Sequence, residues 1–144
     1  MIAVDTNLLV HAHQREATLH SQAAEAIRNL AESPAPWAVC LHCLVEFYGI
    51  VTHQRLWKSP STPEQALDQI AAWRESPSLR LLCDSPGLLE KLAELSVGGR
   101  VHGAAIHDAR IAASCLVAGV RELWTVDRDF SRFPSLRTRN PLAR

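Results

Sequence analysis

Several absences narrow the interpretation of this 144-residue sequence. No apolar stretch approaches the length of a membrane span, and no basic segment leads into an apolar N-terminal run. We therefore expect neither a membrane protein nor a secreted one. Internal repeats, low-complexity tracts and linker-like segments are also lacking. We expect a single domain over residues 1–144, located in the cytoplasm and carrying reduced cysteines.

The four cysteines do not form the spacing of a zinc site. Cys40 and Cys43 make one CxxC pair, but Cys83 and Cys115 stand alone, and zinc needs a second ligand pair. A redox role for the pair stays open because Cys43 lies near a predicted helix start. The simpler interpretation is two small apolar residues at a strand-to-helix junction.

The sequence also lacks net charge, which argues against a protein that binds its partner by bulk electrostatics. The charges are unevenly spread, however. Residues 1–99 carry 7 Lys or Arg against 11 Asp or Glu, whereas residues 100–144 carry 8 Arg against 4 acids. Arginines gathered in this way are suited to bind phosphates, although they are also ordinary solvated surface residues.

Apolar patterning predicts strands that alternate with helices. The predicted strands are Met1–Val4, Trp37–Leu41, Leu79–Leu82, Glu122–Val126 and a short edge strand near Leu136–Thr138. The predicted helices are Leu8–Val10, Ser21–Ala31, Cys43–His53, Thr62–Arg74, Ser85–Gly98 and Asp108–Gly119. Thr62, Pro63 and Gln65 predict a capping box at the start of the fourth helix, and Ser85 is expected to cap the fifth. This alternation, without hairpin signals, is typical of an α/β fold with a parallel sheet.

Four acidic residues lie at element ends or on helix faces that should otherwise be buried. Asp5 follows the first predicted strand, Asp127 follows the fourth, Asp108 opens a helix, and Glu46 lies within an apolar helical stretch. In a parallel sheet these positions share one edge, where four carboxylates repel one another and raise each other's pKa. A divalent cation removes that repulsion, and oxygen-only ligands suit Mg²⁺ or Mn²⁺.

Each acid also has a simpler interpretation. Asp108 is an ordinary N-cap residue, Asp127 is an ordinary turn residue, and Glu46 is compatible with a solvent-facing helix position. Asp5 is the hardest to explain without a partner, since a carboxylate next to an apolar strand is unstable unless something pairs with it. The joint pattern is more specific than any of its members.

In these residues the sequence resembles the PIN-domain family, and more closely the VapC-type toxin ribonucleases of toxin–antitoxin pairs. The matching segments cover essentially the whole chain and occur in the family's order: Val4-Asp5-Thr6-Asn7, Val45-Glu46-Phe47, His107–Ala112 and Thr125–Phe130. The resemblance implies a three-layer α/β/α sandwich with a central, mainly parallel sheet of four to five strands.

The resemblance also implies a set of site residues. The family's acidic, metal-binding positions fall on Asp5, Glu46, Asp108 and Asp127. Its polar supporting positions fall on Asn7 and Thr125.

The fourth acid is the least certain of these assignments, because Asp129 lies only two residues from Asp127. We favour Asp127, which directly follows the predicted strand, and expect Phe130 beside Asp129 to anchor the loop. Arg110 and Arg128 are weaker candidates, as contacts to RNA phosphates.

The chemistry that fits is metal-assisted hydrolysis of RNA phosphodiester bonds with Mg²⁺ or Mn²⁺ as cofactor. By resemblance, the chain is a toxin endoribonuclease whose partners are an RNA substrate and a cognate, VapB-like antitoxin that reaches into the acidic site. Homodimerisation is also the family habit. Apolar residues of Leu67–Trp73 and Leu88–Leu95 exceed what one sheet face needs, but they do not define an interface.

Two other functional classes are compatible with an aspartate after the first strand. A haloacid-dehalogenase-like phosphotransferase uses it as a nucleophile, but requires a second aspartate where Asn7 stands and a catalytic lysine. The only lysines, Lys58 and Lys91, fall in no suitable loop. A non-catalytic module that binds RNA or protein would be marked by loss of an acid, and all four acids are present.

The histidines carry less information. His107 next to Asp108 suggests a general base, although adjacent residues on a helix point in different directions. We expect His11 and His13 to be surface residues.

Overall fold

The computed structural model describes residues 1–143 and contains a five-stranded, entirely parallel sheet. The strands are β1 (Ile2–Val4), β2 (Trp37–Cys40), β3 (Leu79–Leu82), β4 (Glu122–Trp124) and β5 (Thr138–Arg139). Their spatial order is β3-β2-β1-β4-β5, so β1 occupies the centre. The chain leaves β1 toward β2 and β3, and later returns to the other side of β1 at β4.

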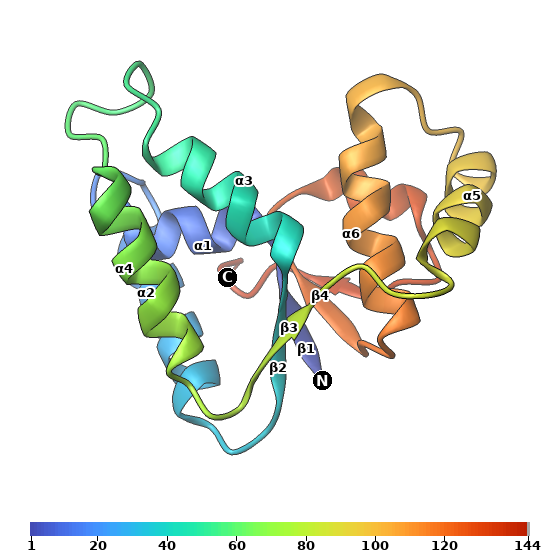
Figure 1. The fold of residues 1–144 in the computed structure, drawn as a ribbon, viewed down its shortest axis with the longest axis horizontal. Helices are drawn as coiled ribbons and strands as arrows, with labels where there is room; N and C mark the ends of the chain where they lie inside the picture. Colours follow the sequence, from blue (N-terminus) through green and yellow to red (C-terminus); the bar gives the residue numbers. More distant parts are fainter. Residues whose placement is uncertain (144) are drawn as a thin grey trace.

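Six α-helices cover the two faces of this sheet within the described residues. They are α1 (Thr6–His13), α2 (His20–Glu32), α3 (Leu41–Val51), α4 (Pro63–Arg74), α5 (Leu88–Gly98) and α6 (Ile106–Val117). Right-handed crossovers place α1–α4 on one face, and the reversed direction from β3 to β4 places α5 and α6 on the other (Figure 1). The expected three-layer α/β/α sandwich is confirmed.

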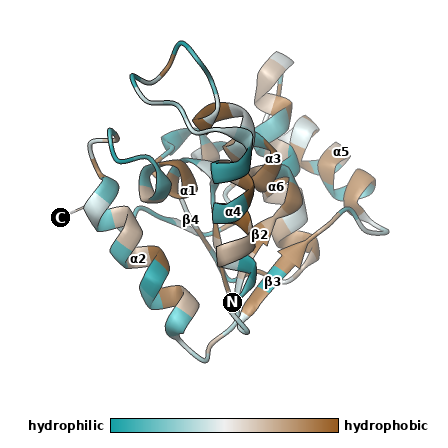
Figure 2. Cartoon of the chain, turned by 60° about the vertical axis from the view of Figure 1, so that its left-hand side comes forward, coloured by the Kyte–Doolittle hydropathy of each residue, from teal (hydrophilic) through white to brown (hydrophobic). Residues whose placement is uncertain are grey.

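The hydrophobic core fills the space between the sheet and both helical layers. All four residues of β2 are buried, as expected for a strand covered on both faces. Trp37, Phe47 and Leu123 are fully buried, and the Trp37 indole N–H donates to Ser76 Oγ at 3.1 Å. Apolar colour covers β3 and α5 as well as the inner strand β2, whereas the loop after α3 is mostly polar and α2 alternates between polar and apolar turns (Figure 2).

Several element boundaries differ from the sequence-based expectation. Helix α1 begins at Thr6, directly after Asp5, and is longer than the predicted Leu8–Val10. Helix α3 likewise begins at Leu41, immediately after β2. Strand β4 ends at Trp124, two residues early, and the edge strand lies at Thr138–Arg139. At the junction of β2 and α3 the sequence pattern missed the boundary because largely apolar residues continue across it without a turn signal.

The structure confirms one of two predicted helix N-caps and contradicts the other. At α4 the expected capping box is present, with the Gln65 N–H donating to Thr62 Oγ1 and Pro63 in the first turn. At α5 the expected Ser85 cap is wrong. Gly87, at φ 89°, precedes the helix instead, in a left-handed conformation that glycine adopts without strain.

The cysteine pair is buried at the junction of β2 and α3. Cys40 and Cys43 are 2% and 0% exposed and both are free thiols, which agrees with the interpretation as small apolar core residues. None of the helices in residues 1–143 combines the length and apolarity that a membrane crossing requires.

Candidate functional site

Asp5 lies at the carboxyl end of the central strand and also caps the helix that follows. Its backbone leaves β1 in an extended conformation, and its Oδ1 accepts the Thr6 N–H at 2.7 Å. The residue is 4% exposed. A buried carboxylate is therefore fixed at the edge where parallel sheets bind ligands.

Two polar side chains hold the other oxygen of this carboxylate. Thr125, just beyond β4, donates its hydroxyl to Asp5 Oδ2 at 2.7 Å. The Asn7 amide donates to the same oxygen at 3.1 Å and to Thr125 Oγ1 at 3.2 Å. The Asp127 N–H also donates to Thr125 Oγ1, at 3.0 Å. Asn7 and Thr125 thus lie where supporting residues were expected.

Burial raises the pKa of Asp5 from 3.8 to about 6. The hydrogen bonds from Thr125 and Thr6 oppose this rise, while the nearby charges of Asp108 and Glu46 add to it. The ionised form of Asp5 is therefore destabilised by its surroundings, and a nearby cation would stabilise it.

A second group of acids faces this edge from α6 and from the loop after β4. Carboxylate oxygens of Asp108, Asp127 and Asp129 lie within 4.8 Å of one another, a spacing that could hold a metal ion. Desolvation, followed by the charge of Asp127, raises the pKa of Asp108. Asp108 is the third residue of α6 and does not cap it, because the N-cap is Ala105. Its simpler interpretation as an N-cap is wrong.

Asp127 and Asp129 have different local roles in this group. Asp127 precedes the short 3₁₀ helix η2 (Arg128–Arg132), and its Oδ1 accepts the Asp129 N–H at 2.8 Å. One oxygen of Asp127 is therefore used in the turn, and Asp127 is half-buried, whereas Asp129 is exposed. Both remain candidates for the fourth acid.

Glu46 reaches the site from α3. Its Oε1 accepts the Thr6 hydroxyl at 3.2 Å and lies 3.3 Å from His42 Nε2, one helical turn earlier. The side chain is 37% exposed, so its predicted position inside the apolar face is only half-buried. Its charge nevertheless raises the pKa of both Asp5 and Asp108, which places it at the same edge.

The donor set fits a hard divalent cation. All of its members offer oxygen, and none of the ion pairs among residues 1–143 involves Asp5, Asp108, Asp127 or Asp129. Burial and neighbouring acids raise the pKa of Asp5 and of Asp108, and a bound metal ion would stabilise the ionised form of both.

The sequence model of the PIN domain matches residues 2–136. The chain belongs to the PIN-domain family. Ribonuclease VapC43 of Mycobacterium tuberculosis is 31% identical to this PIN domain over 144 residues, covering 99% of this chain and 96% of the relative.

Solved structures confirm the PIN fold. A crystal structure of Mycobacterium tuberculosis VapC20, described as a Sarcin-Ricin loop cleaving toxin, has a TM-score of 0.68 at 23% identity and covers 91% of this chain and 93% of that one. A toxin-antitoxin complex from Klebsiella pneumoniae has a TM-score of 0.64 at 22% identity and covers 98% of each chain. At these identities the likeness concerns the fold alone.

The structure of this PIN domain adds residues to the site that sequence reasoning missed. Arg132 of η2 lies close enough to Asp108 to lower its pKa against the other influences. His42 contacts Glu46, and the i, i+4 spacing of these two residues on one helix was the available signal. Arg132 had no such signal, because η2 is an irregular turn.

The two arginines expected at RNA phosphates lie in different surroundings. Arg110 donates to both carboxylate oxygens of Asp84 at 3.2 and 3.1 Å, so its guanidinium already has an anionic partner. Arg128 is exposed at the start of η2, next to Asp127.

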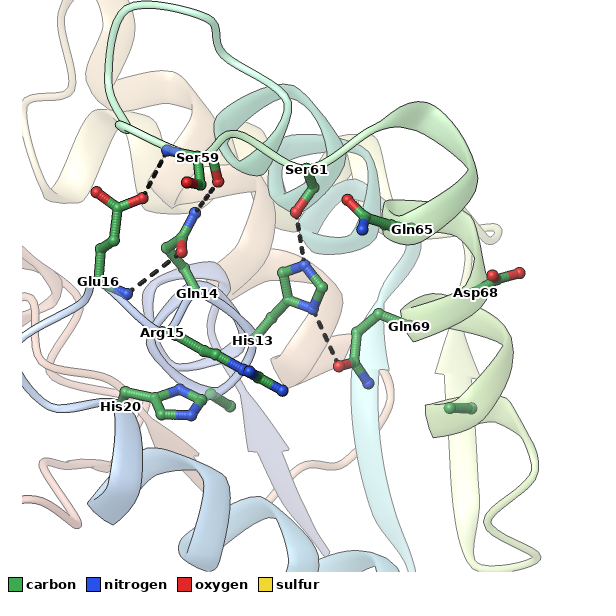
Figure 3. Close-up of a pocket in the computed structure, with 12 residues that line it drawn as sticks. His13, Gln14, Arg15, Glu16, His20, Ser59, Ser61, Gln65, Asp68 and Gln69 are labelled. Carbon is green, nitrogen blue, oxygen red and sulfur yellow. Dashed lines mark hydrogen bonds between the residues drawn. The ribbon is translucent and has the colours of Figure 1, made fainter.

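A second polar region lies at the other end of α1, around His13 (Figure 3). His13 Nε2 is 2.8 Å from Ser61 Oγ, and its Nδ1 is 3.1 Å from Gln69 Oε1. The ring also packs edge-on against Phe47, with centroids 5.3 Å apart. His13 is therefore half-buried and held in place by its neighbours, so it is more enclosed than the expected surface position suggests.

This His13 region borders an open polar cavity of about 900 Å³. Glu16 accepts the backbone N–H groups of Lys58 and Ser59 at 3.0 and 2.9 Å, and the Gln14 amide donates to Ser59 O at 3.4 Å. Asp68 and Gln65 of α4 line the same cavity. The region fastens the loop between α3 and α4 to the end of α1.

Proposed function

We propose that this chain is a metal-dependent endoribonuclease, the toxin of a toxin–antitoxin pair, which hydrolyses RNA phosphodiester bonds at its acidic edge. The observation that carries the proposal is the convergence of buried Asp5 with a three-carboxylate group that no ion pair neutralises. The family match and the curated ribonuclease relative support the same conclusion. They do not favour a haloacid-dehalogenase-like phosphotransferase or a purely RNA- or protein-binding module.

In this proposal Asp5 and Asp108 are direct ligands of Mg²⁺ or Mn²⁺, and Asp127 completes the set. Glu46 either binds the ion or accepts a proton from the attacking water. A bound divalent cation supplies the charge that activates water and stabilises the leaving oxygen. Asn7 and Thr125 orient the Asp5 carboxylate through their hydrogen bonds, and the bond from Thr125 also favours its ionised form.

Arginines near the edge position the phosphate backbone. Arg128 is free to contact a phosphate from the loop beside Asp127. Arg110 contributes only if a phosphate replaces or shares its partner Asp84. Arg128 is accordingly the stronger of the two candidates.

The toxin role requires a VapB-like antitoxin as partner, and an arginine supplied by that antitoxin would neutralise the carboxylates. We further propose that residues 1–144 act as a single PIN domain, that two copies form a homodimer and that the protein works in the cytoplasm. Exposed Leu41, Val45 and Leu67 border one apolar hollow and are available to a second copy.

The decisive experiment is RNA cleavage by the purified chain with Mg²⁺, with Mn²⁺ and with EDTA. Asp108→Asn should lower the cleavage rate at least about 100-fold, because it removes a ligand rather than a residue that supports one. Asp68→Asn, the same chemical change at an exposed acid of α4, should leave the rate unchanged. Equal cleavage by the wild type and Asp108→Asn would refute the proposal.

The choice between Asp127 and Asp129 needs its own comparison. If Asp127 is the ligand, Asp127→Asn lowers cleavage about 10-fold or more, while Asp129→Asn changes it by less than about threefold. Asn at position 127 still caps η2, so the turn is preserved. The reverse order of effects would assign the fourth position to Asp129.

A further inference from the structure

Two imidazole rings stack at the rim of the acidic edge. His42 of α3 and His107 of α6 have ring centroids 5.5 Å apart and planes inclined by 15°. The side chain of His42 is 14% exposed, whereas His107 is an exposed residue. His42 is therefore the inner ring of the pair, and His107 presents its remaining surface to solvent.

The stack adjoins the site from two helices. His42 Nε2 lies 3.3 Å from Glu46 Oε1 without the geometry of a hydrogen bond, and His107 directly precedes Asp108. Neither ring belongs to the carboxylate group of Asp108, Asp127 and Asp129. The mechanism proposed above gives the pair no task.

The exposed rings in residues 1–143 are all histidines, at His53, His102 and His107. No Phe, Tyr or Trp in the described part of the chain is exposed; all are buried or half-buried. Proteins that act on single-stranded RNA commonly stack unpaired bases on aromatic side chains. Beside the acidic edge, His107 offers the surface for such a contact.

We propose that the exposed face of His107 stacks against a nucleobase adjoining the scissile phosphate, with His42 as the inner ring that fixes its orientation. This inference rests on the proposed ribonuclease function and assigns a base-binding position to it. The interaction tolerates any base, since every base has a π face, and it strengthens RNA binding without taking part in proton transfer.

Ring chemistry separates this role from the general-base interpretation of His107. Phenylalanine keeps a flat ring but cannot accept a proton, whereas alanine removes both properties. His107→Phe should therefore retain RNA affinity within about threefold of the wild type. His107→Ala should weaken RNA binding roughly 5- to 100-fold, the range that corresponds to one base–aromatic stack.

The binding experiment uses the full chain and a fluorescein-labelled, single-stranded RNA of mixed sequence in EDTA, read by fluorescence anisotropy. A second series places 2-aminopurine along the RNA, where stacking quenches its emission. Quenching at one position with the wild type and with His107→Phe, and its loss with His107→Ala, is the expected result. His53→Ala, a change at an exposed histidine of the loop after α3, is the matched control.

Cleavage in Mg²⁺ gives the second readout. Stacking predicts that His107→Ala raises KM more than it lowers kcat, and that His107→Phe restores KM. A fall in kcat shared by both variants, with unchanged RNA affinity, would overturn the inference in favour of proton transfer. Wild-type affinity and quenching in His107→Ala would overturn it as well. Absence of cleavage by the wild type would instead refute the ribonuclease proposal.

Discussion

Helix α1 joins two polar regions, and they differ in whether their charged and polar side chains have partners. At its N-terminal end, Asp5 is buried among donors, but neither it nor Asp108, Asp127 or Asp129 forms an ion pair within the described residues. At its C-terminal end, His13, Gln14 and Glu16 each meet a partner on α4 or on the loop before it. A cavity of about 900 Å³ lies at the satisfied end. We therefore place the proposed site by its uncompensated charge rather than by cavity volume.

The sharpest test of this contrast is the pH dependence of stability in the metal-free protein. Because the pKa of Asp5 is about 6 in the folded state and 3.8 in its ordinary state, the folded protein holds a proton that the unfolded chain has lost between these values. The contribution of Asp5 to the free energy of unfolding therefore falls as pH rises through this window, by about 3 kcal/mol. Chemical denaturation at pH 4 and pH 7 measures it.

Asp5→Asn should remove most of this pH dependence and make the metal-free protein more stable at pH 7. Asp68→Asn should retain the wild-type slope, since Asp68 is exposed. Saturating Mg²⁺ should reduce the difference, because a cation that binds only the folded state stabilises it with Asp5 ionised. If the stability of Asp5→Asn keeps the pH dependence of the wild type, Asp5 is not the uncompensated group that distinguishes the N-terminal end of α1.

Thr125→Val tests whether the supporting hydrogen bonds matter for activity. The hydroxyl donates to Asp5 and accepts the N–H of Asp127, so its loss should lower kcat/KM about 10- to 100-fold. The pKa of Asp5 should rise further without this bond, which moves the pH profile of cleavage upward. Thr125→Ser, which keeps the hydroxyl, should retain most of the activity. If Thr125→Val leaves kcat/KM unchanged, Asn7 alone is sufficient to hold the Asp5 carboxylate.

His13→Ala tests the polar region at the C-terminal end of α1. It removes both contacts of the ring and its packing against Phe47, and should destabilise the fold by about 2 kcal/mol. Cleavage measured well below the melting temperature should stay within about twofold of the wild type. A large loss of cleavage in a folded His13→Ala protein would make the His13 region part of the active site.

The smallest effect is expected for Glu16→Gln, since a glutamine has only one acceptor oxygen for the N–H groups of Lys58 and Ser59. The loss should be about 0.5 kcal/mol, with faster hydrogen exchange at these two amides. Glu25→Gln, on the exposed face of α2, is the control. Unchanged exchange would mean that Glu16 does not fasten the loop.

Much of this arrangement could be predicted from the sequence, because the apolar strands and the acids after them are local patterns. The five strands, their parallel direction and the capping box at Thr62 all follow from such patterns. What could not be predicted depends on contacts between distant segments. The stacking of His42 on His107 and the bonding of His13 to Ser61 join residues 65 and 48 positions apart, and single-sequence patterns carry no information about such pairs.

Both carboxylate oxygens of Asp5 accept hydrogen bonds, and this affects the choice of residue for an inactive variant. One oxygen of this carboxylate starts α1 and the other anchors the residues after β4, so replacing Asp5 changes helix initiation and chemistry together. An inactive variant that must keep the native surface for an antitoxin should instead carry a substitution at Asp108, which does not cap a helix. Asp5 variants suit the opposite purpose, in which folding itself is under study.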